Sequence, residues 1–225
     1  MRTDEPTAKG DRTRQRIRAA ALRSFRENGY DATTIRKVAA EVGVSVGVTN
    51  YHFPSKNHLV QELYLDVQEA HRAAAAPLLA AERGLVDRLR VVFTTGLDQL
   101  EPYHPHAGEF LSAAVSPRSP VNPLAPESAD SLAIVQGLFG QALDGASASA
   151  VSDDIRALLP RALVLAHLLL ALFWVYDTSE GRRRTRRLVD RGLKVLATAL
   201  PLTRVPGIRR GVKDLLALAT EVRPR

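Results

Sequence analysis

The stretch TTIRKVAAEVGVSVGVTNYHFPSK at residues 33–56 decides the architecture of the first part of this chain. Thr33 or Thr34 can cap a short helix, because a hydroxyl oxygen accepts a hydrogen bond from a free N–H group of the first turn. Gly43 permits a tight turn after that helix, and a second short helix is expected over about residues 45–52. Two short helices around a glycine turn are typical of a helix-turn-helix, which places its second helix in the major groove of DNA.

The rest of the chain has the hydrophobic spacing of helices. Apolar residues recur at intervals of three and four, and the sustained alternation that indicates strands is scarce. Glycine and proline gather between the apolar segments, where they end helices. The sequence therefore predicts helices over about residues 11–28, 34–42, 45–52, 56–76, 85–100, 108–115, 131–143, 154–177, 179–200 and 208–222.

Composition excludes several classes of protein. The chain has 225 residues, enough to bury a core, and it has no cysteine for disulfides, zinc-thiolate sites or thiol catalysis. Its polar N-terminus lacks the apolar run of a signal peptide, and the apolar stretch 162–176 is short for a membrane span. His104 and His106 share a proline-flanked loop but lack a third ligand. We expect a cytoplasmic protein with no membrane association, metal or cofactor.

The net charge of +7 is unevenly distributed. Residues 1–60 contain eleven Lys and Arg against six Asp and Glu, whereas residues 61–225 contain twenty against eighteen. The basic excess therefore lies on the segment with the helix-turn-helix pattern, as expected if that segment meets a phosphate backbone. A generic basic surface would give the same imbalance, so charge alone does not decide between the two interpretations.

A recognition helix needs one anchored side and one exposed side. Val44, Val48 and Phe53 are expected to anchor it, while Arg36 reaches a base edge and Lys56 a phosphate. The side chains expected at the DNA are short, polar, aromatic or basic, and these suit base edges, thymine methyl groups and phosphates. They are Thr33, Thr34, Arg36, Ser45, Val46, Gly47, Thr49, Asn50, Tyr51, His52 and Lys56.

The first predicted helix carries three further basic residues near its start, Arg12, Arg14 and Arg16. They follow the DNA backbone, enter a minor groove, or belong to a solvated tail.

The segment at residues 29–59 resembles the DNA-binding domain of the TetR family of bacterial transcription regulators. The residues that carry the resemblance are Gly29-Tyr30, Thr33-Thr34, Val38-Ala39, Gly43-Val44-Ser45, Gly47, Tyr51-His52-Phe53 and Lys56. The similarity covers about residues 12–60. One position departs from the pattern, because Asn50 stands where many members of the family carry a tyrosine that contacts phosphate.

The resemblance implies an all-α fold with two parts. Residues 1–11 would be a flexible basic arm, residues 12–55 a three-helix helix-turn-helix domain, and residues 56–225 a larger helical ligand-binding and dimerisation domain. The function implied is that of a homodimeric repressor, released from double-stranded operator DNA by a small molecule. An activator or a ligand-independent regulator of the same fold is the alternative. A non-specific DNA-binding protein is a further alternative. An enzyme is least expected, because no catalytic motif stands out.

The resemblance also implies that the second domain binds a small molecule, and the aromatic and imidazole side chains of that domain suit an apolar or aromatic effector. The side chains expected to line its site are aromatic or imidazole groups, and ordinary core packing is the alternative for each. They are Phe93, Tyr103, His104, Phe110, Phe139, His167, Phe173 and Trp174. The eighth and ninth predicted helices, at 154–177 and 179–200, are expected to form the homodimer as a four-helix bundle. Alternatively, their apolar faces close the core of a single subunit.

Overall fold

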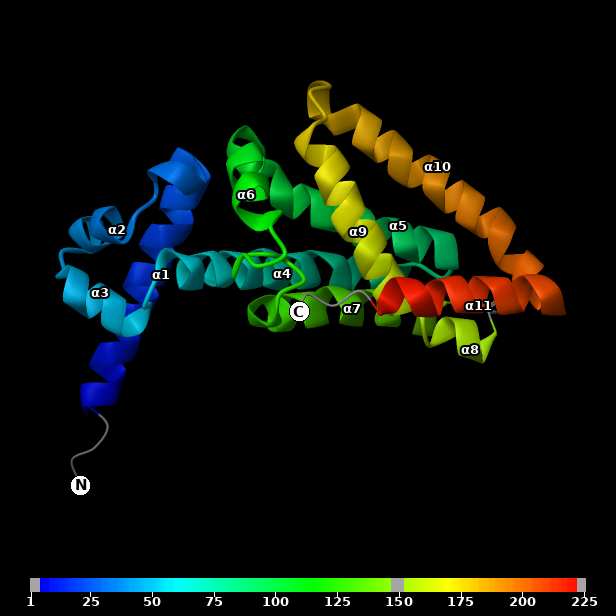
Figure 1. The fold of residues 1–225 in the computed structure, drawn as a ribbon, viewed down its shortest axis with the longest axis horizontal. Helices are drawn as coiled ribbons and strands as arrows, with labels where there is room; N and C mark the ends of the chain where they lie inside the picture. Colours follow the sequence, from blue (N-terminus) through cyan, green and yellow to red (C-terminus); the bar gives the residue numbers. More distant parts are fainter. Residues whose placement is uncertain (1–4, 147–151, 222–225) are drawn as a thin grey trace.

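The computed structural model describes residues 5–146 and 152–221, and all regular secondary structure in these ranges is helical. The predicted all-α class is therefore confirmed. Figure 1 shows a small group of helices at one end and a larger bundle at the other, joined by one long helix. We call α1–α3 the head and α4–α11 the body.

The head contains α1 (Glu5–Ala32), α2 (Ile35–Val42) and α3 (Val46–His52). The long connecting helix is α4 (Lys56–Ala81), and α5 (Leu85–Leu100) and α7 (Ala129–Asp144) pack along it. The remaining α-helices of the body are α6 (Ala107–Ala114), α8 (Asp153–Arg156), α9 (Leu159–Val175), α10 (Arg183–Ala199) and α11 (Pro206–Thr220). Short 3₁₀ segments at Glu101–His106, Pro126–Ser128, Glu180–Arg182 and Leu200–Arg204 connect some of them.

Three differences from the predicted helix bounds lie at prolines. Helix α1 begins at Glu5 rather than near residue 11, because Pro6 is compatible with a first helical turn. The expected arm is therefore helical from residue 5, and residues 1–4 lie outside the described chain. The helix expected at 154–177 is divided into α8 and α9, since Pro160 fits only the first turn of α9. Helix α4 continues past Pro77 to Ala81 because Ala75 and Leu79 are buried in the body.

Two hydrophobic cores meet along α4. In the head, Ile17, Ala21 and Phe25 lie four residues apart and are buried, as their spacing predicts. Helix α4 adds Leu59 and Leu63 to this core and contributes its later residues to the body core. The head core therefore continues past the predicted domain boundary at residue 55. No helix in residues 5–146 and 152–221 is long and apolar enough to cross a membrane.

Candidate nucleic-acid interface

Two capping residues and one left-handed glycine build the helix-turn-helix. The Thr34 hydroxyl accepts a hydrogen bond from the Lys37 N–H group (3.2 Å), and the Ser45 hydroxyl accepts one from the Val48 N–H group (3.2 Å). Gly43 has φ 73° and ψ 35°, a conformation that favours glycine at the end of a helix. The predicted glycine turn is thus confirmed, Thr34 rather than Thr33 caps α2, and the structure adds Ser45 as the cap of α3.

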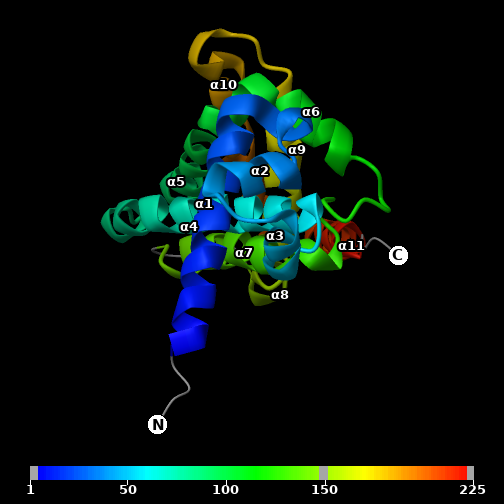
Figure 2. The same cartoon turned by 90° about the vertical axis from the view of Figure 1, so that its left-hand side faces the viewer.

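The outer side of α3 is open to solvent at the end of the molecule that faces the viewer in Figure 2. Tyr51 is 84% exposed, and Gly47 and Asn50 are also exposed. On the adjoining start of α2, Arg36 and Lys37 are exposed, and neither side chain has a hydrogen-bond or ion-pair partner within the described residues. This end of the head therefore offers uncompensated positive charge beside an exposed helix.

A surface hollow lies between the start of α2 and α3. It is lined by Thr34, Ile35, Arg36, Val46 and Asn50. Four of these five residues belong to the predicted DNA-facing set, and they come from both helices of the motif. The hollow thus brings a cation, a carboxamide and an apolar side chain to one place.

Two threonines predicted at the DNA are fully buried. Thr33 is 0% exposed, and its hydroxyl donates to the Gly29 carbonyl (2.7 Å) and contacts the Ser24 hydroxyl (2.8 Å). Thr49 is also 0% exposed, and its hydroxyl donates to the Ser45 carbonyl (3.3 Å). Thr49 lies four residues before buried Phe53, about one helical turn, so both side chains face inward. The prediction was wrong for both threonines.

Val48 turns outward instead and is 40% exposed, although it was expected to anchor α3. Val44 is partly buried and Phe53 is fully buried, so the anchoring role predicted for these two residues is confirmed. His52 is partly buried, and its ring lies 5.1 Å from that of Tyr51 in an edge-on contact.

Lys56 is already engaged within the protein. Its ammonium group donates to the Tyr30 carbonyl and lies 3.6 Å from the centre of the Tyr30 ring. Burial lowers the pKa of Lys56, and the nearby carboxylates of Asp31 and Glu109 oppose that shift. Lys56 therefore fixes the C-terminal end of α1. A phosphate would have to compete with Tyr30 for the Lys56 ammonium group.

Two of the three arginines near the start of α1, for which DNA contact and a solvated tail were the alternatives, are also engaged. Arg14 forms an ion pair with Glu62 and lies over the Phe53 ring, 4.9 Å from its centre. Arg16 donates to the Val42 carbonyl (2.6 Å). Arg12 alone of the three is exposed and unpaired within the described chain.

The head contacts the body at the C-terminal end of α1, beyond a kink at Gly29. Glu109, near the start of α6, accepts a hydrogen bond from the Asp31 N–H group (2.8 Å) and contacts His106 Nδ1 (3.1 Å). The Asp31 N–H group lowers the pKa of Glu109, with His106 as a smaller cause. Beside this contact the Tyr30 ring lies 5.7 Å from that of Phe110. Phe110 lies equally close to the Phe25 ring, so polar and aromatic contacts together join α6 to the head.

The structure divides the eight predicted effector residues among several places. Phe110 and Tyr103 pack against the head core, at its junction with the body. Phe173 lies on the surface of α9, 42% exposed. His104 and Trp174 contact each other edge to face, with ring centres 4.6 Å apart. Only three of the eight, Phe93, Phe139 and His167, gather in the centre of the body.

That central group contains a histidine that sequence reasoning missed, His71 on α4. The His71 and His167 rings are stacked with centres 5.9 Å apart, and Phe93 and Phe139 flank His167. His71 Nε2 donates to the Val92 carbonyl (2.9 Å), whereas His167 Nδ1 is buried without a partner. Burial lowers the pKa of both imidazoles, and for His167 it does so to about 3 with His71 contributing. Both rings are therefore neutral near pH 7.

Comparison with sequence families identifies the chain. The profile described as "Bacterial regulatory proteins, tetR family" matches residues 17–63, and the profile described as "Tetracyclin repressor-like, C-terminal domain" matches residues 88–215. The second match alone spans more than half of the chain. The protein belongs to the TetR family. This is a family of regulators rather than enzymes, and the predicted membership is confirmed.

Named relatives align with less than half of this chain. The HTH-type transcriptional repressor AcnR of Corynebacterium diphtheriae is 39% identical over 77 residues, 34% of this chain and 38% of AcnR. The repressor KstR2 of Mycolicibacterium smegmatis is 27% identical over 104 residues, 46% of this chain and 50% of KstR2. The chain spans 26% of the first curated relatives that it matches, which are uncharacterized mycobacterial HTH-type regulators.

Solved TetR structures share the fold over most of the chain. A regulator from Streptomyces coelicolor has a TM-score of 0.62 at 14% identity, covering 93% of this chain and 90% of that one. Thermus thermophilus FadR, in complex with lauroyl-CoA, has a TM-score of 0.60 at 21% identity, covering 80% and 92%. The multidrug binding protein EbrR, complexed with imidazole, has a TM-score of 0.51 at 25% identity, covering 79% and 93%.

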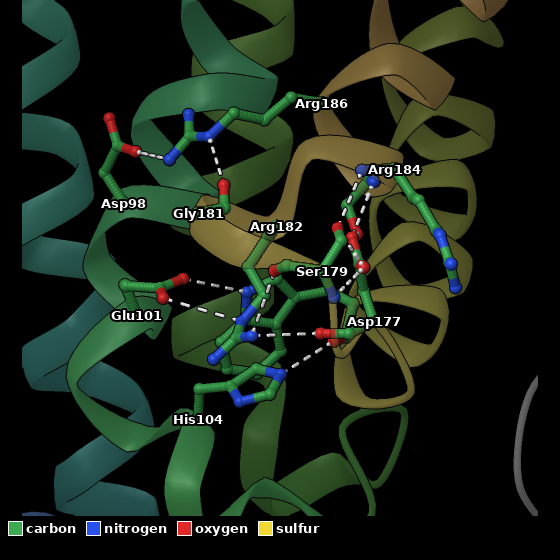
Figure 3. Close-up of polar contacts among 11 residues, drawn as sticks. Asp98, Glu101, His104, Asp177, Ser179, Gly181, Arg182, Arg184 and Arg186 are labelled. Carbon is green, nitrogen blue, oxygen red and sulfur yellow. Dashed lines mark hydrogen bonds and ion pairs between the residues drawn. The ribbon is translucent and has the colours of Figure 1, made fainter.

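In this TetR chain the turn between α9 and α10 is a dense polar cluster, drawn in Figure 3. Buried Asp177 accepts hydrogen bonds from the N–H and hydroxyl groups of Ser179 (3.0 and 2.6 Å) and from those of Thr185 (2.8 and 2.7 Å). Arg182 donates to the Asp177 carbonyl (3.1 Å) and lies 3.5 Å from Glu101. Glu101 also accepts from the indole N–H group of Trp174 (3.3 Å). The cluster fixes how α10 leaves α9.

Helices α9 and α10 of the TetR fold expose apolar side chains on the body surface. On α9 these are Leu169, Leu172 and Phe173, followed by Tyr176; on α10 they are Leu188 and Val195. Other side chains of both helices fill the body core. The two helices thus close the core and also leave an apolar surface outside it.

Sequence signals existed for some of the missed residues. His71 continues the four-residue spacing of Leu63 and Val67, which indicates a buried side chain. Asp177 precedes Ser179 by two positions, a spacing at which a carboxylate commonly closes a turn. Glu109 carries no such signal, because its partner Asp31 lies far away in the sequence.

Proposed function

We propose that this protein is a homodimeric transcriptional repressor that binds double-stranded operator DNA through α3 and is released by a small molecule bound in the body. The observation that carries the proposal is the exposed outer side of α3 beside unpaired Arg36 and Lys37. A helix with open polar and apolar side chains next to free cations suits a DNA groove between phosphates. The names of AcnR and KstR2 as repressors support the sign of regulation.

The exposed apolar faces of α9 and α10 support a two-fold dimer. Two helices from each subunit would form a four-helix bundle, in which the same surface patch meets its own copy. Two copies of α3 would then read half-sites about one helical turn apart, which is about 34 Å along the DNA.

The central group of the body supports an apolar or aromatic effector. Phe93, Phe139 and the His71–His167 pair offer aromatic faces, and His167 Nδ1 is a buried polar atom without a partner. A ligand that supplies a hydrogen bond to this nitrogen would remove the cost of leaving it unsatisfied. FadR with lauroyl-CoA and EbrR with proflavin have this fold, and their ligands are an acyl thioester and an aromatic cation.

A route for release runs through residues 101–110. At its start Glu101 and His104 contact Trp174 at the end of α9. At its end Glu109 and Phe110 contact the head. A ligand that displaces α9 would therefore shift the position of the head and hence the distance between the two copies of α3. Such a ligand acts by binding one arrangement of head and body more tightly than the other.

The function is tested with genomic DNA. The immobilised full-length protein is incubated with fragmented genomic DNA, and recovered duplexes are compared with shuffled ones by fluorescence anisotropy. We expect binding that weakens with salt and that is about a thousandfold tighter for recovered duplexes, as for specific regulators. Equal affinity for both would contradict an operator-specific repressor and favour a non-specific binder. Activation of the neighbouring genes in cells would favour the activator alternative.

Substitution of Arg36 or Tyr51 by alanine is expected to weaken binding to the recovered duplex about tenfold each, as for lost base or phosphate contacts. Thermal unfolding should be unchanged, because both side chains are exposed and neither contacts the core. Lys56→Ala serves as the contrast, since it removes contacts to Tyr30 and should lower the melting temperature as well. Unchanged affinity in both Arg36→Ala and Tyr51→Ala would rule out this face of α3.

Removal of the Glu109 carboxylate is expected to loosen the head from the body. In Glu109→Ala the Asp31 N–H group loses its acceptor, so its hydrogen exchange should accelerate about tenfold. Because the pKa of Glu109 is lowered in the folded protein, the protection is present above the usual pKa of a glutamate and is lost as pH falls through the lowered value.

The matched control is Glu180→Ala, since Glu180 forms only an exposed ion pair with Arg183. Its substitution should leave exchange at Asp31 unchanged. Equal exchange rates in wild type and Glu109→Ala would remove Glu109 from the proposed route.

A further inference from the structure

The outer side of α3 carries two exposed valines around a glycine that packing does not require. Val46 and Val48 are 41% and 40% exposed. A β-carbon built on Gly47 would meet only the Ser45 hydroxyl, at 3.7 Å, which is ordinary van der Waals contact. The backbone of Gly47 also does not need a positive φ. The fold would therefore accept a side chain at this position, and its absence leaves the helix backbone open between two apolar groups.

The helical geometry places these groups symmetrically. Successive residues of an α-helix are about 100° apart, so Val46 and Val48 project to opposite sides of Gly47. Thr49 and Phe53 face the core, which makes Gly47 and Tyr51 the outermost positions of the helix. If α3 enters a groove with Gly47 nearest its floor, one valine points toward each side of that groove.

The surroundings of the valines favour DNA as the occupant of this apolar surface. Val46 shares its hollow with Arg36 and Asn50, and Lys37 is unpaired close by along α2. A cationic rim attracts a polyanion and disfavours a second basic surface such as another head. In the major groove the one apolar group that a base presents is the 5-methyl group of thymine.

We infer that Val46 and Val48 recognise thymine methyl groups, so that each operator half-site carries a thymine on either side of the position that faces Gly47. The inference rests on the proposed operator binding and specifies what α3 reads. Arg36, in the same hollow as Val46, adds a donor fork suited to a guanine next to the first thymine.

The experiment uses the full-length protein and a library of random duplexes. Binding sites are selected from this library, and the best site is then synthesised with deoxyuridine in place of each thymidine in turn. Deoxyuridine removes the methyl group and leaves base pairing intact. We expect an affinity loss of about fourfold at two positions in each half-site, the factor that corresponds to one buried methyl group, and little loss elsewhere.

The variants Val46→Ala and Val48→Ala assign the two positions. Each should abolish the deoxyuridine effect at one position only, whereas an effect of the methyl group on DNA shape would persist in both variants. Val46→Thr is the size-matched control, since it keeps one methyl group at the same place. Both valines are exposed, so unchanged melting temperatures will show that the variants fold.

The outcomes distinguish operator binding from thymine recognition. Failure to enrich any site would overturn the operator binding itself. Enrichment of a site that is bound equally well with uracil throughout would leave operator binding intact and overturn the thymine inference. A deoxyuridine effect that survives in both alanine variants would also overturn it.

Discussion

Gly29→Ala is expected to destabilise the protein by about 2–4 kcal/mol, combining backbone strain with a steric clash. Gly29 has φ 81° and ψ −177°, a region that only glycine occupies readily. A β-carbon there would also lie 2.5 Å from a carboxylate oxygen of Glu109 and 2.6 Å from His106 Nδ1. These are the groups that hold the head against the body, so the substitution should both strain the turn and displace α6.

Thermal unfolding measures the effect. For a chain of this length the expected loss corresponds to a fall in melting temperature of about 5–15 °C. Gly137→Ala on α7 is the matched control, because its β-carbon would meet nothing within 4 Å. That substitution should stabilise the protein by about 0.5–1 kcal/mol, as for alanine replacing glycine within a helix.

A double variant separates the two causes. Glu109→Ala removes the carboxylate that the new β-carbon would strike, so Gly29→Ala should cost less in that background. The cost that remains belongs to the backbone of residue 29. A wild-type melting temperature for Gly29→Ala would show that residue 29 does not require a positive φ. It would also contradict the close contact of Glu109 and His106 with residue 29.

The contrast between Gly43 and Gly29 shows what the sequence could predict. The role of Gly43 follows from local rules, since a glycine between two short amphipathic segments ends one helix and starts a turn. The break in α1 at Gly29 follows in the same way, but the close approach of Gly29 to Glu109 does not. That contact joins residues 78 positions apart along the chain at Asp31 and Glu109, and no periodic pattern reports such a pairing.

Within the helix-turn-helix, the sequence also did not decide which of two adjacent threonines caps α2. Thr33 and Thr34 are equally able to cap a helix, and their order in the sequence does not choose between them. The choice depends on Gly29, whose carbonyl takes the Thr33 hydroxyl and leaves Thr34 as the cap. On α3, the one-residue difference between Thr49 and Val48 decides which side chain is exposed. Spacing predicted a two-sided helix but not its rotation, because Phe53 rather than Val48 sets the buried direction.

The sequence predicted which aromatic residues belong to the body but not which of them lie close together. Phe93, Phe139 and His167 meet because α5 and α7 pack along α4 and α9 packs on α7, whereas Phe110 faces the head from α6. Which face of each helix points inward depends on tertiary packing. Composition alone therefore predicted suitable ligand chemistry without predicting where those groups come together.

Asp177→Ala is expected to destabilise the protein by about 3–4 kcal/mol, because it leaves buried donors without an acceptor. Thr185 is 0% exposed, and both its N–H and hydroxyl groups donate to Asp177, as do those of Ser179. Ser179→Ala is the milder control, since it removes one of these four donors and keeps the carboxylate. Glu180→Ala next to it removes only an exposed ion pair and should be neutral.

The dependence on pH identifies the ionised carboxylate as the cause. Although desolvation opposes it, hydrogen bonds from Ser179 and Thr185 hold the pKa of Asp177 well below that of an ordinary aspartate. A group with a lowered folded pKa stabilises the protein above its unfolded value, and that contribution is lost as pH falls through the folded value. The difference in unfolding free energy between wild type and Asp177→Ala should therefore be constant from about pH 5 to 8 and shrink below about pH 4.

Asp177 also connects stability to assembly, because its turn sets the direction in which α10 leaves α9. If these two helices form the dimer, Asp177→Ala should dissociate at protein concentrations at which Ser179→Ala remains dimeric in sedimentation. The same loss should weaken operator binding, since a monomer reads only one half-site. A stable, dimeric Asp177→Ala protein would mean that the turn does not orient α10. Other contacts would then set the orientation of α10 relative to α9.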